Sequence, residues 1–231
     1  MSYLQKGSGK DLVLLHGYLS SKEAFLAQVS YFSKFYRVTA LDFLGFGHSR
    51  CLTSAFSVQD YADWTKAVLQ ALGVEKPCLI AHSFGCRVAI KIASQEKDFF
   101  DKMILTGAAG VRLPRTWGYH YKVFVYRLMK KMFPQFAEKH FGSAEYRTLS
   151  PLMKESYKKI VNEDLRACAK EIENEVLLVV GEGDNVTPLK EVNEYLVCLK
   201  RGKLVIMPGG HFAFAEYPTA FNIIAEEFLY G

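Results

Sequence analysis

The chain has 231 residues, of which 50% are hydrophobic and 23% charged, and its net charge is +5. This length suits one well-buried domain, and no apolar run approaches the ~20 residues that span a membrane. Residues 1–7 lack the pattern of a signal peptide. The five cysteines are scattered without metal-type spacing. We therefore expect a cytoplasmic protein that holds no metal.

Short apolar runs predict strands, and the segments between them have helical periodicity. Strands that alternate with helices predict an α/β fold with a mostly parallel central sheet flanked by helices. Ligands of such sheets bind at the carboxyl ends of the strands. The predicted strands are 12–16, 36–41, 78–82, 102–105, 176–180 and 203–207, with a short first strand near 3–5, and the predicted helices are 22–32, 57–72, 84–94, 189–196 and 218–229.

Residues 111–164 interrupt this alternation with a helical pattern rich in aromatic side chains. Residues 111–160 hold eleven Lys or Arg and three Glu, a local charge of +8. One interpretation is a solvated basic face whose aromatics pack on the core. The other is a surface that attracts acidic substrates or an anionic membrane. Nucleic-acid binding is not expected, because no known binding module accompanies the charge.

A serine stands at the end of the predicted strand 78–82. Ala81 and Gly85 lie two positions before and after Ser83. Small residues at this spacing are typical of a nucleophile elbow, a sharp strand–turn–helix that lifts the serine hydroxyl out of the sheet. The pattern is short and carries weight only if a base, an acid and an oxyanion site follow elsewhere.

Those partners are found after other strands. Asp184 follows the strand 176–180, and His211 follows the strand 203–207 in a glycine-rich loop. His16 and Gly17 end the strand 12–16. The order serine, aspartate, histidine is that of α/β-hydrolases and differs from chymotrypsin and subtilisin.

The chain resembles the α/β-hydrolase superfamily over nearly its whole length, and most closely its small capped serine esterases. The dehalogenase and epoxide-hydrolase branches use an aspartate nucleophile, which this chain lacks at position 83. Position 81 is Ala where Gly is commoner, which small-residue sterics tolerate. The matching stretches are 14–17, 42–49, 81–85, 181–184 with 187–188, and 209–211.

The resemblance implies a catalytic triad in which Ser83 attacks, His211 acts as base and Asp184 orients the imidazole. It implies an oxyanion hole formed by the backbone N–H groups of Tyr18 and Phe84. It further implies a core formed by 1–110 and 165–231 and a helical cap formed by 111–164.

Other residues near these motifs are expected to be structural. His16 should brace the oxyanion turn, the side chain of His82 should point away from Ser83, and Asp42 should hold a loop under the site. The expected substrate pocket is apolar, with Phe43, Trp117, Tyr121 and Phe212 in its wall.

Three functions fit these features. The first is a carboxylesterase, a serine hydrolase that cleaves a small-molecule ester with a small or medium hydrophobic acyl group through an acyl-enzyme. The second is another triad reaction on an anionic substrate: a C–C hydrolase, a menaquinone-pathway lyase, an aminopeptidase or an acyltransferase. Third is a ligand-binding receptor with slow turnover. No cofactor is expected, and the oligomeric state stays open. Pocket arginines would favour the second function, with Arg87, Arg112, Arg115 and Arg147 as candidates.

Overall fold

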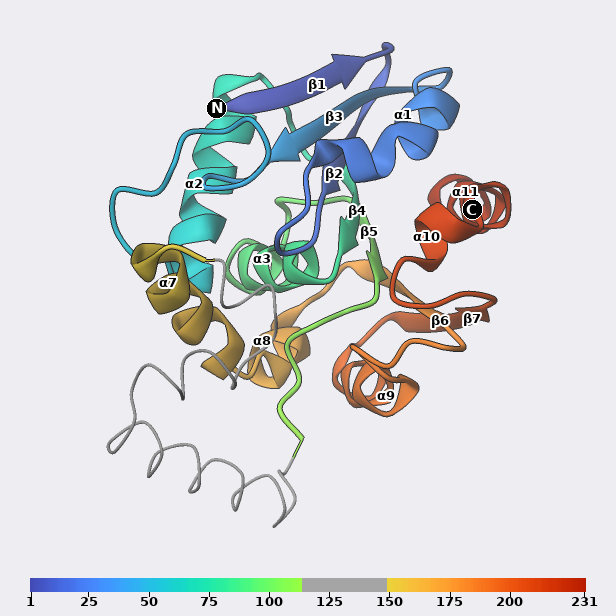
Figure 1. Ribbon diagram of the computed structural model, residues 1–231. Coiled ribbons are helices and arrows are strands. Elements are labelled where there is room, and N and C mark those ends of the chain that lie inside the picture. Colours follow the sequence, from blue (N-terminus) through green and yellow to red (C-terminus); the bar gives the residue numbers. More distant parts are fainter. Residues whose placement is uncertain (114–148) are drawn as a thin grey trace.

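The computed structural model describes residues 1–113 and 149–231 (Figure 1). In this part of the chain, seven strands form one sheet in the order β1-β3-β2-β4-β5-β6-β7. Strand β1 is antiparallel to β3, and the other neighbours are parallel. The strands are β1 (Ser2–Lys6), β2 (Lys10–Leu15), β3 (Tyr36–Asp42), β4 (Cys78–His82), β5 (Lys102–Thr106), β6 (Glu175–Gly181) and β7 (Gly202–Met207).

Helices cover both faces of the sheet, so the predicted α/β class is confirmed (Figure 1). The segment predicted as one helix over 22–32 is a 3-10 turn followed by an α-helix. The short helices α8 and α10 were not predicted. The helices are η1 (Lys22–Phe25), α1 (Leu26–Phe32), α2 (Val58–Ala71), α3 (Phe84–Gln95), α7 (Pro151–Asn162), α8 (Arg166–Glu171), α9 (Leu189–Cys198), α10 (Ala213–Glu216) and α11 (Pro218–Tyr230).

Side chains of the central strands alternate between two hydrophobic cores. Leu12 and Leu14 of β2 face the core under α1, α10 and α11. Val13 and Leu15 face the core under α2, α3, α8 and α9. All four are fully buried, and each stabilises the fold by about 1.5–3 kcal/mol. The sheet is therefore held on both faces, and its strand ends are fixed in position.

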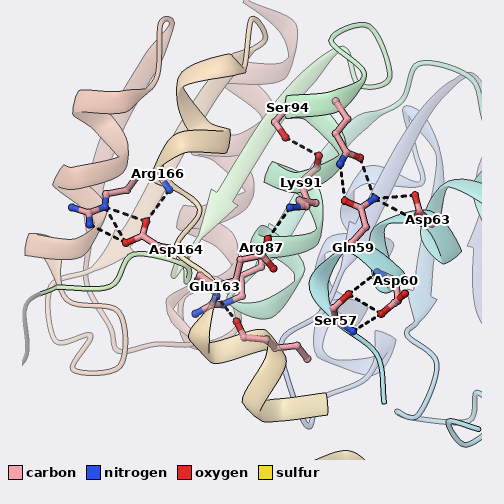
Figure 2. A network of polar contacts seen from close by, with 12 residues as sticks. Ser57, Gln59, Asp60, Asp63, Arg87, Lys91, Ser94, Glu163, Asp164 and Arg166 are labelled. Atoms are coloured by element: carbon pink, nitrogen blue, oxygen red, sulfur yellow. Dashed lines mark hydrogen bonds and ion pairs between the residues drawn. The ribbon is translucent and has the colours of Figure 1, made fainter. Parts of the chain in front are cut away.

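Helix α7 is bound to the helix that follows Ser83 (Figure 2). The guanidinium of Arg87, in α3, donates to the carbonyls of Ile160 and Glu163 over 2.9 and 3.0 Å. Lys91 of α3 pairs with the carboxylate of Glu163 over 2.7 Å. Burial lowers the pKa of Arg87. Arg87 was a candidate for binding an anionic substrate, but here its guanidinium caps the C-terminus of α7.

The two described ends of the predicted cap lie beside each other. Arg112 donates from its backbone N–H to Asp164 over 3.2 Å and from its guanidinium to the carbonyl of Asn162 over 2.8 Å. Arg166 pairs with Asp164 over 2.9 Å (Figure 2). Contacts between the two ends are expected where the residues between them form an insertion. The cap itself stays a prediction because residues 114–148 lie outside the described residues. None of the helices in 1–113 and 149–231 has the length and apolarity that a membrane crossing requires.

Candidate active site

Ser83 lies between β4 and α3 with φ 49° and ψ −105°. A positive φ is strained for a residue with a side chain, and such strain is often stored at active sites. The backbone N–H of Ser83 donates to the backbone carbonyl of Thr106, in β5, over 3.0 Å. A Cβ at Gly85 would overlap the backbone carbonyl of Leu15. The predicted sharp turn is therefore present, and Gly85 permits it because only glycine fits against β2.

Asp184 and His211 lie at the ends of neighbouring strands and bond to each other. His211 Nδ1 lies 2.9 Å from Asp184 Oδ2. The side chain of Asp184 is fully buried and that of His211 is 12% exposed. Because an ionised carboxylate only accepts, His211 donates from Nδ1, which leaves Nε2 with a lone pair to act as a base.

The carboxylate of Asp184 is held ionised by donors around it. Its Oδ1 accepts from the backbone N–H groups of Val186 and Thr187 over 2.8 and 2.9 Å. Its Oδ2 accepts from the hydroxyl of Thr187 over 2.7 Å. Burial alone would raise the pKa of Asp184, but the hydrogen bonds from His211 and Thr187 outweigh it and lower the pKa to about 2.

His211 packs beside the elbow. Its ring centroid lies 4.7 Å from that of His82, the residue before Ser83. A Cβ at Gly107, which follows β5, would lie 3.0 Å from the ring of His211. Among the described residues the Ser83 hydroxyl makes no hydrogen bond, and such bonds are often loose without substrate. The structure thus brings the three predicted triad residues to one edge of the sheet.

The two predicted oxyanion residues are also neighbours. The rings of Tyr18 and Phe84 meet at right angles with centroids 5.7 Å apart. Phe84 begins α3, so its N–H has no partner within the helix. Tyr18 lies in the turn after β2. The two residues therefore lie beside each other next to Ser83, and the oxyanion hole formed by their backbone N–H groups stays a prediction.

His16 braces that turn, as predicted. Its Nδ1 lies 2.7 Å from the carbonyl of Gly17, and its Nε2 accepts from the backbone N–H of Phe43 over 3.1 Å. These partners require a neutral ring that donates from Nδ1. Burial lowers the pKa of His16 to about 4. His16 is therefore a fixed support and not a base.

Aromatic side chains surround the oxyanion turn. The ring of Tyr18 lies 4.9 Å from that of Phe46 and 5.2 Å from that of Tyr157, in α7. The hydroxyl of Tyr18 donates to the carbonyl of Met153, also in α7, over 3.3 Å. Helix α7 thus lies directly against the site. Sequence reasoning did not identify Met153 or Tyr157 as site neighbours, and no local signal marks them.

The predicted pocket residues have different positions. Phe43 is fully buried in the core, 5.1 Å from the ring of Phe84, so it supports the site from beneath. Phe212 is 43% exposed and its ring lies 5.5 Å from that of His211. Trp117 and Tyr121 lie outside the described residues, as does Arg115. Position 147, the fourth candidate arginine, also lies outside them.

Asp42 holds a loop beneath the site, as predicted. Its carboxylate accepts from the backbone N–H of Lys22 and of His48. Among the described residues, Glu23, Asp42 and His48 place possible metal-ligand atoms within 4.8 Å of one another. The ammonium of Lys22 already bonds Glu23 over 2.9 Å and Asp42 over 2.7 Å. This cluster is a salt bridge that closes the loop.

A polar cleft lies at the opposite edge of the sheet, where β5 and β6 begin. Its charges are of both signs and pair with each other: Lys97 with Glu173 over 2.8 Å, and Arg201 with Glu175. It holds no nucleophile beside a base, so it is not a candidate for the chemistry. Its lining residues are Lys76, Lys97, Asp98, Phe100, Asp101, Lys102, Glu173, Asn174, Glu175 and Arg201.

Comparison with known proteins agrees with this fold. The family model described as the alpha/beta hydrolase fold matches residues 11–152, which is more than half of the chain. The chain belongs to the α/β-hydrolase fold family. The matched residues of this α/β-hydrolase-fold chain run from β2 through the elbow and past β5.

Two curated relatives and two solved structures are similar to it. (E)-2-((N-methylformamido)methylene)succinate hydrolase of Acinetobacter baylyi is 34% identical over 106 residues, which cover 46% of this chain but only 40% of that relative. 2-Hydroxymuconate semialdehyde hydrolase of Pseudomonas sp. is 25% identical over 248 residues, covering 96% of this chain and 88% of the relative.

The meta-cleavage product hydrolase CumD of Pseudomonas fluorescens, in a mutant form complexed with acetates, has a TM-score of 0.76 at 25% identity. The alignment covers 98% of this chain and 93% of CumD. The esterase EaEST of Exiguobacterium antarcticum has a TM-score of 0.78 at 20% identity, covering 99% of this chain and 95% of the esterase. At that identity the esterase shares the fold alone.

Proposed function

We propose that the chain is a serine hydrolase of small anionic molecules that carry a reactive carbonyl group beside a carboxylate. Ser83 is the nucleophile, His211 the base and Asp184 the residue that orients His211. The observation that carries the serine chemistry of this proposal is the 2.9 Å bond between His211 Nδ1 and Asp184 Oδ2, next to a serine on a strained turn.

The reaction begins when Ser83 Oγ attacks the carbonyl carbon and its proton passes to Nε2 of His211. The carbonyl oxygen becomes negative and accepts from the N–H groups of Tyr18 and Phe84, each of which contributes about 3 kcal/mol. His211 then returns the proton to the leaving group. Water, deprotonated by the same Nε2, cleaves the acyl-enzyme and frees Ser83.

The relatives support an anionic substrate. Their names specify a formamido-bearing succinate and the semialdehyde of 2-hydroxymuconate. The first name describes a formamide, whose carbonyl is bonded to nitrogen, and the second describes an aldehyde on carbon; in both, the unsaturated skeleton carries carboxylate. We propose the same class of substrate for this chain. When a C–C bond of such a substrate breaks, conjugation would stabilise the electron pair that stays on the leaving fragment. The local charge of +8 in residues 111–160 supports the attraction of such an anion.

Hydrolysis of a small or medium hydrophobic ester is the second candidate. It is favoured by the aromatic surroundings of the oxyanion turn, where Tyr18 contacts Phe46, Phe84 and Tyr157. The triad and the oxyanion donors would act on an ester in the same way, with an alcohol oxygen as the leaving atom. The two candidates differ in the group that the site accepts and in the leaving atom, and they share the nucleophile and the base.

A substrate panel distinguishes them. Wild type, Ser83→Ala and the control Ser94→Ala, at the far end of the same helix, are assayed with a conjugated semialdehyde acid and with p-nitrophenyl esters from acetate to dodecanoate. We expect kcat/KM for the acid to exceed that for the esters by at least about tenfold, a barrier difference of roughly 1.4 kcal/mol. Succinate should inhibit, and Ser83→Ala should be inactive while Ser94→Ala is not.

Preferred turnover of esters without inhibition by succinate would replace the anionic class with the esterase. Equal turnover by wild type and Ser83→Ala would contradict serine catalysis for both candidates. A wild type that binds these acids but neither turns over nor reacts with a fluorophosphonate would favour the ligand-binding receptor.

A further inference from the structure

His82 lies between the elbow and the loop that carries His211, and it is only 1% exposed. Its Nε2 lies 2.9 Å from the backbone carbonyl of His211. A carbonyl oxygen can only accept, so Nε2 of His82 carries the proton and donates it. This hydrogen bond joins the residue before the nucleophile to the backbone of the base.

We propose that His82 is a positioning residue, which holds the backbone of His211 so that the imidazole stays within reach of Ser83. The proposal rests on the proposed function, since it gives His82 a role only if His211 acts on Ser83. It places His82 outside the reacting groups, because its side chain contacts the base through the backbone carbonyl.

The ring of His82 is fixed on several sides. Its centroid lies 4.7 Å from that of His211 and 4.8 Å from those of Phe212 and Phe214. On the other side, a Cβ at Gly17 would lie 2.8 Å from Nδ1 of His82. The ring therefore fills the space between the oxyanion turn and the base, and it cannot rotate without displacing one of them.

The same surroundings keep His82 neutral. Burial and the neighbouring His211 lower the pKa of His82 to about 3. Its buried Nδ1 has no hydrogen-bond partner in the described part of the chain. A proton on Nδ1 would point at Gly17 with nothing to accept it. His82 thus stays a donor through Nε2 alone over the neutral pH range.

The loop that carries His211 is held by hydrogen bonds at several successive points. Residues 208–210 include two glycines, and Gly209 has a φ of 113°, so this backbone is intrinsically adaptable. Glu216 fixes one point by accepting from the N–H of Gly210 over 2.8 Å. The carbonyls of Gly209 and Gly210 accept from the backbone N–H groups of Gly183 and Ala213 over 2.9 and 3.2 Å. His82 holds the carbonyl that follows them, that of His211 itself. A displacement of about 1 Å in a catalytic group can lower a rate about 100-fold.

The test compares His82→Phe, which keeps a buried ring without the donor, with His82→Gln, which restores an N–H at similar reach. His48→Gln, at a side chain 80% exposed, is the matched control. We expect His82→Phe to lower kcat about 100-fold with KM nearly unchanged. The kcat of His82→Gln should exceed that of His82→Phe by at least about tenfold. Unchanged kcat in His82→Phe, or no recovery in His82→Gln, would overturn the proposal.

A second measurement does not depend on turnover or on a folded variant. Nitrogen NMR of the wild type reports which nitrogen of each of the six histidines carries a proton. We expect His82 to be neutral and protonated on Nε2 from about pH 5.5 to 8. Protonation on Nδ1, or titration within that range, would overturn the proposal. If the wild type neither turns over nor reacts with a fluorophosphonate, the proposed function fails, whereas the tautomer still tests this hydrogen bond separately.

Discussion

Asp184 and His211 are joined by a buried hydrogen bond of 2.9 Å between Oδ2 and Nδ1, although 27 residues separate them in the chain. Each follows a different strand, β6 and β7, and these strands are parallel neighbours. The bond selects the tautomer of His211 that leaves Nε2 free.

Replacing the carboxylate should impair the base without unfolding the protein. In Asp184→Asn, Oδ1 can still accept from the N–H groups of Val186 and Thr187. The amide NH₂ would face Nδ1 of His211 and favour the wrong tautomer, so kcat should fall by about 10⁴-fold. Steady-state kinetics and a thermal melt check this. A variant within tenfold of wild type would show that Asp184 does not orient the base.

The elbow should tolerate no side chain at Gly85. In Gly85→Ala the added Cβ would overlap the carbonyl of Leu15, and we expect a loss of about 1–3 kcal/mol in the free energy of unfolding. The comparison is Gly73→Ala, where a Cβ meets nothing within 4 Å and only the φ of 62° resists substitution. Urea unfolding measures both. A Gly85→Ala protein more stable than Gly73→Ala would contradict the close approach.

The buried cap on α7 should contribute more to stability than the ion pair beside it. Arg87→Met leaves the carbonyls of Ile160 and Glu163 without their charged donor, at a cost of about 1.5–3 kcal/mol. Lys91→Met, one turn further along α3, removes a partly exposed pair worth at most about 1 kcal/mol. Equal destabilisation of the two variants in urea would argue against a buried cap.

Stability should fall in mild acid because two buried histidines are neutral. The pKa of His16 is lowered to about 4 and that of His82 to about 3, below the value of about 6.5 in an unfolded chain. Below about pH 6.5 the unfolded state binds more protons, so the contribution of each histidine is lost as pH falls, by about 3 kcal/mol each at pH 4.

Asp184 affects the free energy of unfolding at lower pH than the two histidines do. Its pKa is lowered to about 2, so its contribution is complete above about pH 4 and is lost as pH falls toward 2. Urea unfolding at several pH values tests the contributions of the two histidines and of Asp184. A free energy of unfolding that stays flat between about pH 7 and 4 would show that His16 and His82 are not buried in the neutral form.

The strands and the order of the site motifs could be predicted from the sequence because both depend on local patterns. Apolar runs such as 78–82 form strands, and parallel strands bring their carboxyl ends to one edge, which places Ser83, Asp184 and His211 together. The predicted helix over 22–32 was wrong only in its continuity, since it changes from 3-10 to α geometry at Phe25.

What could not be predicted depends on partners far along the chain. Arg87 bonds to carbonyls 73 and 76 residues away, and the pattern of α3 says nothing of them. His82 was expected to be structural and to point away from Ser83, yet its partner is the carbonyl of the base, 129 residues away. Such contacts arise only when α7 and the loop after β7 meet α3 and β4.

The most direct test of the central claim, that His211 activates Ser83, is covalent labelling with a fluorophosphonate. Wild type, Ser83→Ala, His211→Ala and the control Ser94→Ala are compared at equal concentration after a melt confirms that each is folded. We predict labelling of wild type and Ser94→Ala alone, with one adduct on Ser83. Labelling of His211→Ala at the rate of wild type, or of a folded Ser83→Ala, would contradict the account.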